Sequence, residues 1–330
     1  MECGKTEPLV SVAVITYNSS NTVLETLNSI AGQTYQNLEL IVSDDCSTDN
    51  TVEICREWVK QNKCRFARTE IITVERNTGT SGNLNRAEDA CRGVWVKSVA
   101  GDDVFMPNCI QDCMDYVSGH QDTIYLFGCC KVFGADDSYC AKIDKQFDYS
   151  FFSLSQEQQL HRLLFDGNCI PAPTVFYHRE RAKSLGIKKD ERIPLLEDWP
   201  QWINLLRAGV KLHFVNKILV KYRVNGLSTS IRASLPMFKS DRLFQFYYRF
   251  PEWMKEDEEK AIQRMVDDEC RVYQMLIESE TDTQTSLRQE RNRYKEQYEI
   301  YYKWYDQIQH SKAYQLGKAI LKPLKWIGKL

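Results

Sequence analysis

Three pairs of adjacent acids could do chemistry in this sequence. Asp102 and Asp103 end the apolar run "VWVKSVAGDD", and Glu197 and Asp198 stand in "LLEDWPQW". Adjacent carboxylates raise each other's pKa unless a cation or hydrogen-bond donors compensate their charge. A hard divalent ion held by one or two carboxylates typically completes its shell with substrate phosphates. The first pair therefore predicts a Mg²⁺ or Mn²⁺ site for a diphosphate, although paired acids in a loop are also common as solvated turn residues.

The second pair begins a predicted helix, and two interpretations are open. Acidic side chains at a helix start are stabilised by the helix dipole. A carboxylate can also serve there as a general base that takes the proton of an acceptor hydroxyl. The order of residues alone does not decide between these roles for Glu197 and Asp198.

Asp44 and Asp45 form a third pair, in "IVSDDCSTDNT". One interpretation is that Asp45, Ser47 or Thr48 caps the helix that follows. A carboxylate at a strand end can also accept a hydrogen bond from a nucleotide base or a ribose hydroxyl. Both interpretations stay open at this point.

Alternating strands and helices would position these acids. Apolar and β-branched runs predict strands, and an apolar stripe at helical spacing predicts a helix. The predicted strands cover 9–17, 38–45, 66–77, 94–103 and 122–134, with one or two more after Gly209 and up to Tyr222. The predicted helices cover 18–34, 47–62, 80–93 and about 198–209. This alternation predicts an α/β fold with a mainly parallel, doubly wound sheet. Such sheets bind ligands at the carboxyl ends of their strands, where the 44–45 and 102–103 pairs fall.

Two loops separate this sequence from other nucleotide-binding classes. The stretch "RNTGTSGNLNRA" has glycines near a helix start, where backbone amides can receive an anion. Its spacing is not Gly-x-Gly-x-x-Gly and it follows the third strand, which argues against a dinucleotide-binding oxidoreductase. A nucleotidyltransferase would normally show a basic, glycine-rich loop after the first strand, and "TYNSSNTV" has neither Lys nor Arg.

Composition excludes several classes. The 330 residues are 43% hydrophobic and 27% charged with a net charge of -2, so no global field points to nucleic acid. The 12 Cys are scattered, with no paired spacing of a zinc site, and predict reduced thiols. We see no secretory leader and no apolar run of membrane-spanning length, so we expect a cytoplasmic protein.

Five stretches together resemble a known family. They are "VSVAVITYN", "LELIVSDDCSTDNT", "ERNTGTSGNLN", "AGDDVFMPN" and "LLEDWPQW". In this order and spacing, residues 8 to about 225 resemble a glycosyltransferase family 2 enzyme of the GT-A fold. The resemblance implies transfer of a sugar from a nucleotide-diphosphate donor with inversion at the anomeric carbon.

The resemblance also implies roles for individual residues. Asp103 would bind the metal, Asp198 would be the base, and Glu197 beside it would orient a sugar. The donor would contact Tyr17, Asp44, Asp45, Asn77 and Asp102. The nucleotide of the donor could be UDP, GDP or dTDP, and UDP is favoured by its frequency in the family.

One position departs from the common pattern of the family. Many members carry a further Asp where this chain has Ala100. Metal binding through Asp103 would survive, but a non-catalytic scaffold that resembles these enzymes stays open as an alternative. Processive polysaccharide synthases add a Gln-x-x-Arg-Trp segment and membrane spans, which this sequence lacks, so we expect one sugar per acceptor visit.

The C-terminal third changes in character. We expect a GT-A domain over 1–230, a helical extension over 231–310 and a basic amphipathic helix over 311–330. On a helical wheel, Lys318 and three further lysines share one face, which is typical of binding to an anionic membrane surface. Similar tails in the family suggest a lipid-linked acceptor in bacterial O-antigen or capsule assembly at the inner face of the membrane. The long helical pattern would also suit a homodimer.

Overall fold

The computed structural model describes residues 7–224 and 235–256, together with residues 260 and 264. The chain divides into two compact units, Met1–Pro251 and Glu252–Leu330. The sheet and every site residue described below belong to the first unit.

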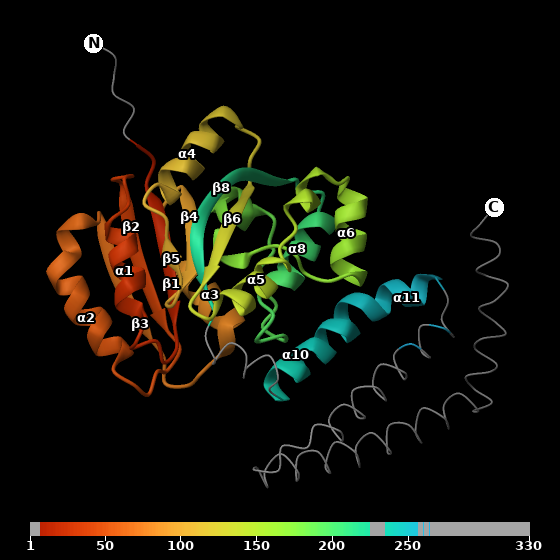
Figure 1. Ribbon diagram of the computed structural model, residues 1–330, viewed down its shortest axis with the longest axis horizontal. Helices are drawn as coiled ribbons and strands as arrows, with labels where there is room; N and C mark the ends of the chain where they lie inside the picture. Colours follow the sequence, from red (N-terminus) through yellow and green to blue (C-terminus); the bar gives the residue numbers. More distant parts are fainter. Residues whose placement is uncertain (1–6, 225–234, 257–259, 261–263, 265–330) are drawn as a thin grey trace, which may run out of the picture. The chain divides into compact units, whose positions relative to one another are not determined.

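Within the described residues, eight strands form one sheet (Figure 1). They are β1 (Val10–Thr16), β2 (Leu38–Asp44), β3 (Arg68–Thr73), β4 (Trp95–Ala100), β5 (Val104–Phe105), β6 (Tyr125–Phe133), β7 (Phe176–His178) and β8 (Leu212–Arg223). Their order across the sheet is β3-β2-β1-β4-β7-β6-β8-β5. The pairs among β1 to β4 are parallel, as is β6 with β8. Strand β7 runs antiparallel to both β4 and β6, and β5 runs antiparallel to β8.

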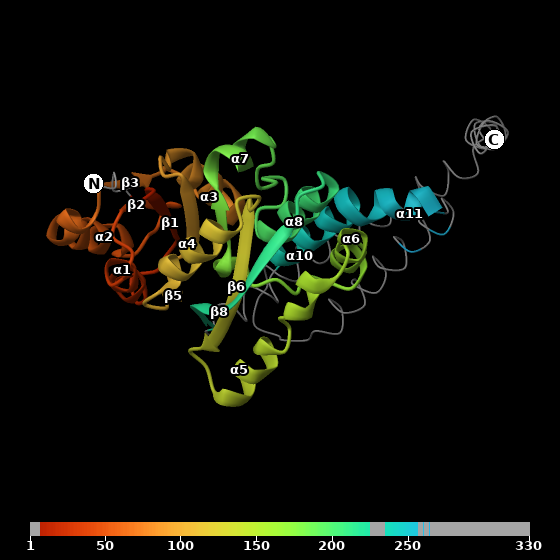
Figure 2. The same ribbon diagram turned by 90° about the horizontal axis from the view of Figure 1, so that it is seen from above.

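Helices cover both faces of the sheet. They are α1 (Val23–Ala31), α2 (Thr51–Asn62), α3 (Gly79–Ala90), α4 (Cys109–Gly119), α5 (Asp137–Asp144), α6 (Gln156–Phe165), α7 (Arg179–Ser184), α8 (Asp198–Arg207), α10 (Leu235–Phe244) and α11 (Phe250–Glu256). Single turns are η1 (Lys63–Arg65), η2 (Tyr149–Ser153), η3 (Ala172–Thr174) and the π-helical turn η4 (Gln245–Arg249). In the view of Figure 2, α1 and α7 lie on opposite sides of the strands.

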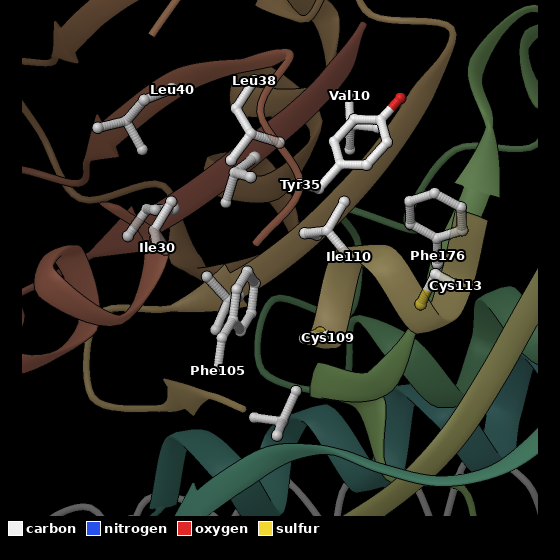
Figure 3. Close-up of a cluster of buried hydrophobic side chains, with 14 of the residues drawn as sticks. Val10, Ile30, Tyr35, Leu38, Leu40, Phe105, Cys109, Ile110, Cys113 and Phe176 are labelled. Atoms are coloured by element: carbon white, nitrogen blue, oxygen red, sulfur yellow. The ribbon is translucent and has the colours of Figure 1, made fainter. Parts of the chain in front are cut away.

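The side-chain alternation of β1 explains the two cores. Val10, Val12 and Val14 are fully buried against side chains of α1, α2 and α4. Ala13 points to the other face, where it joins side chains of α3, α6 and α8. Figure 3 shows part of the first core, in which Ile110 of α4 lies among residues of α1 and β2. Because helices cover both faces of the sheet, the sequences of these strands are nearly continuous apolar runs.

The predicted α/β fold is confirmed, and the predicted strands match β1, β2, β3, β4 and β6. The short strands β5 and β7 escaped prediction because two or three residues carry no periodic pattern. The stretch 135–190, which the sequence left unassigned, holds α5, α6, α7 and β7. Its antiparallel strand makes the sheet mixed in the middle rather than parallel throughout.

None of the described helices is long and apolar enough to cross a membrane. The predicted basic helix at 311–330 lies outside the described residues, as does most of the predicted extension at 231–310.

Candidate active site

A cavity of about 630 Å³ opens at the carboxyl ends of β1 and β4. Tyr17 lines its rim, with half of its side chain exposed. Asp102 and Asp103, which follow β4, line the same cavity as Glu197 and Asp198 at the start of α8. The fold therefore brings both acid pairs, far apart in the sequence, into one space.

Close packing holds the acid loop, residues 101–103, against β1. The N–H of Gly101 donates to the carbonyl of Ile15 at 2.8 Å. Thr22 donates its hydroxyl to the carbonyl of Gly101 at 2.9 Å. A Cβ on Gly101 would lie only 2.8 Å from Cγ2 of Thr16. This close approach requires glycine at position 101 and fixes the backbone position from which Asp102 and Asp103 follow.

Arg223, the last residue of β8, braces the acid loop from the other side. Its backbone N–H donates to Oδ1 of Asp103 at 2.8 Å, and its Nε donates to the carbonyl of Asp102 at 2.8 Å. Its guanidinium also pairs with Glu25 of α1. Within the described part of the chain, Oδ2 of Asp103 accepts no hydrogen bond, so this oxygen is available to a ligand.

Burial makes the acid loop costly to ionise without a cation. Asp103 is 2% exposed, and burial followed by repulsion from Asp102 raises its pKa well above the usual range. Burial also raises the pKa of Asp102, against the opposing charge of Arg223. The described residues contain no group of three or more His, Cys, Asp and Glu side chains that could hold a metal by themselves. Two acids with a free oxygen fit Mg²⁺ or Mn²⁺, which is commonly shared with waters and phosphates.

A buried lysine supports the wall beside this loop. Nζ of Lys97 on β4 donates to the carbonyl of Val175 at 3.1 Å and to that of Pro173. Burial lowers the pKa of Lys97, and its charge acts on Asp103. Because Pro173 and Val175 both line the cavity, Lys97 fixes part of the wall from behind.

The second acid pair has unequal hydrogen bonding. Oδ1 of Asp198 accepts from the N–H of Trp199, and its Oδ2 accepts from Nδ2 of Asn168, both at 2.7 Å. Glu197 makes no side-chain bond to the helix start. Burial, and then the charge of Asp198, raises the pKa of Glu197 to about 8. Burial also raises the pKa of Asp198, but its two donors oppose that rise. With a pKa of about 8, Glu197 holds a proton at neutral pH. In Asp198 the two donors favour the charged form over the neutral form.

The other predicted donor residues lie outside the lining of the cavity. Asp44 is 2% exposed and accepts from the hydroxyl of Thr16 and the N–H of Ser47, both at 2.8 Å. Asn77 is exposed, and its side-chain oxygen accepts from the N–H of Gly79 at 3.0 Å. Their contact with a donor stays a prediction.

Asp45 is also buried, and its carboxylate is occupied by the protein itself. It accepts from the N–H groups of Thr78 and Gly79 at 2.9 and 2.8 Å, and from Arg86 at 2.9 Å. Capping by Asp45 therefore occurs ahead of α3 and not at α2, the helix that follows Asp45. The anion that we expected at those amides is a side chain of this protein.

The sequence analysis missed residues that line the cavity together with the acid pairs. Lys189 pairs with Glu88 of α3 at 2.6 Å, and the hydroxyl of Ser98 donates to the same Glu88 oxygen at 2.9 Å. A signal existed for Glu88, because it lies four residues after Leu84 and so on the buried side of α3. Lys189 follows no pattern and stands in the unassigned stretch.

Segments late in the first unit support the second acid pair. The ring of Phe244 in α10 packs on Trp199, with centroids 4.2 Å apart. In η4, the hydroxyl of Tyr248 donates to Asp190 and accepts from Asn204, each at 3.0 Å. These contacts hold both the loop that precedes Glu197 and the helix that follows it.

Comparison with known proteins agrees with this geometry. Residues 11–180 match the family described as Glycosyl transferase family 2. Among similar proteins is WfaP of Escherichia coli, a UDP-Glc:α-D-GlcNAc-diphosphoundecaprenol β-1,3-glucosyltransferase. It is 29% identical over 225 residues, which cover 67% of this chain and 80% of WfaP.

Solved structures share the fold. TarS of S. aureus, residues 1–349 in complex with UDP-GlcNAc, superposes with a TM-score of 0.58 at 18% identity, over 84% of this chain and 77% of TarS. The mannosyltransferase PcManGT of Pyrobaculum calidifontis, in complex with GDP-Man and Mn²⁺, gives 0.53 at 15% identity, over 76% of this chain and 65% of PcManGT. At these identities the likeness bears on the fold alone, and it confirms the GT-A architecture.

Proposed function

The chain belongs to glycosyltransferase family 2, and on this premise we propose that it transfers one sugar from a UDP-sugar to a hydroxyl of a lipid-linked saccharide, with inversion. The observation that carries the proposal is that Asp102, Asp103, Glu197 and Asp198 line one cavity at the carboxyl ends of β1 and β4. One acid pair would serve the departing diphosphate and the other would activate the acceptor. With the base facing the departing diphosphate across the reacting carbon, attack would be in line, which demands inversion.

On the donor side, Tyr17 offers an exposed ring at the rim for the nucleotide base. Asp102 would contact the ribose or diphosphate, and Asp44 and Asn77 complete the proposed donor set. Asp45 is not part of this set, because Thr78, Gly79 and Arg86 already donate to its carboxylate. UDP is supported by two relatives, since WfaP is named for UDP-Glc and TarS is solved with UDP-GlcNAc.

We assign the metal to Asp103, whose Oδ2 accepts no bond from the described residues. A bound Mn²⁺ or Mg²⁺ would offset the negative charge that develops on the departing diphosphate. Arg223 would keep Asp103 aimed through its backbone N–H, at 2.8 Å. The mannosyltransferase with GDP-Man and Mn²⁺ supports a divalent cation in this fold.

On the acceptor side, Asp198 would take the proton of the attacking hydroxyl as general base. Asn168 and the N–H of Trp199 hold its carboxylate in place, each at 2.7 Å. Glu197, which holds a proton at neutral pH, would donate a hydrogen bond that orients a sugar.

The acceptor would be a sugar carried on a lipid diphosphate, the acceptor class in the name of WfaP. Such an acceptor belongs to assembly of a surface polysaccharide such as O-antigen or capsule. The basic segment 311–330 would keep the enzyme at the inner face of the membrane that holds the acceptor.

A donor panel tests the function. We expect release of nucleoside diphosphate from one UDP-sugar in the presence of Mn²⁺, and loss of that release on addition of EDTA. Asp198→Asn should lower transfer by roughly 10²- to 10⁴-fold without weakening UDP binding. Asp103→Ala should abolish the Mn²⁺ dependence of UDP binding.

Full transfer by Asp198→Asn would remove the base assignment. Unchanged Mn²⁺ and UDP binding by Asp103→Ala would remove the metal assignment. If calorimetry detects no UDP binding with Mn²⁺, the non-catalytic scaffold that Ala100 leaves open replaces the enzyme.

A further inference from the structure

A buried ion pair lies in the same cavity as the two acid pairs, and the charge of its lysine acts on Glu197 and Asp198. The side chains of Lys189 and Glu88 are 6% and 15% exposed, and their charged atoms are 2.6 Å apart. Ser98, Tyr125 and Tyr177 line the cavity with them and are also buried. We call these five residues the floor of the cavity. The rim at Tyr17 is open to solvent, whereas the floor is polar and shielded from it.

The protein holds Lys189 firmly in this place. Asn85 of α3 bonds the backbone of Lys189 on both sides, to its N–H and to its carbonyl, each at 3.1 Å. The hydroxyl of Ser81, one turn earlier, donates to the carbonyl of Ile193 at 2.9 Å. These bonds fix the backbone of Lys189 against α3, and the ion pair with Glu88 holds its ammonium group at the floor.

The floor has hydrogen-bonding capacity that the protein does not use. An ammonium group carries three N–H donors, and among the described residues Nζ of Lys189 donates only to Glu88. Trp202, which also lines the cavity, is 1% exposed, and its Nε1 finds no acceptor in the described chain. Buried donors are normally satisfied, so a ligand with several oxygen acceptors would complete this site.

Charge limits what that ligand is. Glu88 already neutralises Lys189, and no second Lys or Arg is among the floor residues. A carboxylate on the ligand would bring a further negative charge to a buried place, close to Glu88 and to Asp198. Without a second cation, such a charge is strongly disfavoured. Hydroxyl groups satisfy spare donors without adding charge.

We infer that the Glu88–Lys189 pair selects a neutral hexose on the donor and excludes a hexuronic acid. The inference rests on the proposed function and narrows its substrate class. We assign the donor sugar, and not the acceptor sugar, to the floor. The donor sugar is the terminal group of the donor molecule and can therefore reach the buried floor residues. An acceptor attached to a lipid needs an open path to solvent.

Two pairs of commercial donors differ only at C6 and test the selection directly. UDP-glucose and UDP-galactose carry a hydroxymethyl group where UDP-glucuronate and UDP-galacturonate carry a carboxylate. With full-length protein and Mn²⁺, calorimetry should show the better hexose donor binding at least tenfold more tightly than its uronate. Equal affinities within both pairs would overturn the inference, and this comparison needs no variant to fold.

Variants then locate the selection. Glu88→Gln leaves Lys189 without its counter-charge, so the hexose-to-uronate affinity ratio should fall at least fivefold. Lys189→Met removes the spare donors, so affinity for the hexose donor should fall about tenfold while affinity for UDP alone is kept. A ratio unchanged in folded Glu88→Gln would overturn the assignment to this pair.

The chain supplies a matched control on the same two segments. Lys188 and Asp89 form the neighbouring ion pair at 2.7 Å, but both side chains are 64% exposed. Lys188→Met and Asp89→Asn should leave the ratio unchanged, and a shift as large as that of Glu88→Gln would mean general charge rather than the floor. Absence of UDP binding in wild type would overturn the proposed function and this inference together. UDP binding with equal affinities would overturn this inference alone.

Discussion

Asn168 is the neighbour that most favours the charged form of Asp198. Its amide donates to Oδ2 at 2.7 Å and lowers the pKa that burial raises. Asn168→Ala should therefore raise the pKa of Asp198 and move the acidic limb of the kcat/KM profile upward by about one unit. Activity would fall most at low pH and recover as pH rises.

The pH profile of transfer, measured from pH 5 to 9, checks this outcome. Asn62→Ala is a suitable control, because Asn62 makes a similar side-chain bond on α2, to the carbonyl of Trp58. An acidic limb in the same place in both variants would mean that Asn168 does not tune the base.

Glu197 predicts a pH dependence of stability. Its pKa in the folded protein, about 8, lies above its ordinary value of 4.5. The folded state thus binds this proton more tightly than the unfolded state. The contribution of Glu197 to stability is therefore fully present below pH 4.5 and is lost as pH rises through 8. Glu197→Gln, which stays neutral, should be more stable than wild type at pH 8, by roughly a few kcal/mol.

Urea unfolding at pH 5, 6, 7 and 8 measures the free energy of unfolding that this prediction concerns. Glu157→Gln, on the exposed first turn of α6, is the control and should follow wild type. If the free energy of unfolding falls equally with pH in Glu197→Gln and wild type, Glu197 does not carry the proton of this acid pair.

Site residues that directly follow a strand could be predicted from the sequence. Site residues that depend on a partner far along the chain could not. Asp103 stands directly after an apolar run, so its place at a strand end could be inferred. Glu88 becomes part of the cavity only because Lys189, a hundred positions away, reaches it. Asp45 was predicted to bind a ligand, but its carboxylate accepts hydrogen bonds from backbone amides of the loop before α3.

At the scale of elements, the acid loop depends on its contact with β1. Thr16 cannot move aside, because it is 2% exposed in the strand and its hydroxyl bonds Asp44. Gly101→Ala should therefore displace the loop, lower the free energy of unfolding by ~1–3 kcal/mol, and weaken UDP binding with Mn²⁺.

Gly119→Ala is the matched control for Gly101→Ala. Gly119 ends α4, and a Cβ there would meet no atom within 4 Å. Its stability and UDP binding should equal or slightly exceed those of wild type. Thermal unfolding and calorimetry compare the two, and a Gly101→Ala variant as stable and as competent as Gly119→Ala would show that the contact is dispensable.

Strand length explains which elements could be predicted. β1 and β2 are seven residues long and buried on both faces, so their apolar runs stand out in the sequence. β7 has three residues and forms only because β4 and β6 flank it with backbone partners. Its antiparallel direction is a property of the assembled sheet that no local pattern carries.

At the scale of the first unit, the two halves of the sheet contribute different parts of one site. The parallel half supplies Tyr17 and the acid loop, from β1 and β4. The mixed half supplies Arg223, from β8, and the elements that carry Asn168 and Asp198. A cavity that requires both halves explains why the resemblance extends over most of this unit and not over a single motif.

For the whole chain, the segment 311–330 predicts binding to anionic membranes. If this segment is helical, as its sequence predicts, Lys318, Lys322, Lys325 and Lys329 would fall on one face opposite apolar side chains. Each Lys near an anionic surface contributes ~1 kcal/mol, so replacing all four by Gln should weaken binding to phosphatidylglycerol vesicles at least tenfold. Sedimentation with vesicles at 50 and 500 mM salt measures this, and wild-type binding should fall at the higher salt.

The control replaces four exposed lysines of the first unit, Lys60, Lys63, Lys131 and Lys142, by Gln. If both variants lose binding equally, net charge and not this segment binds the protein to the vesicles.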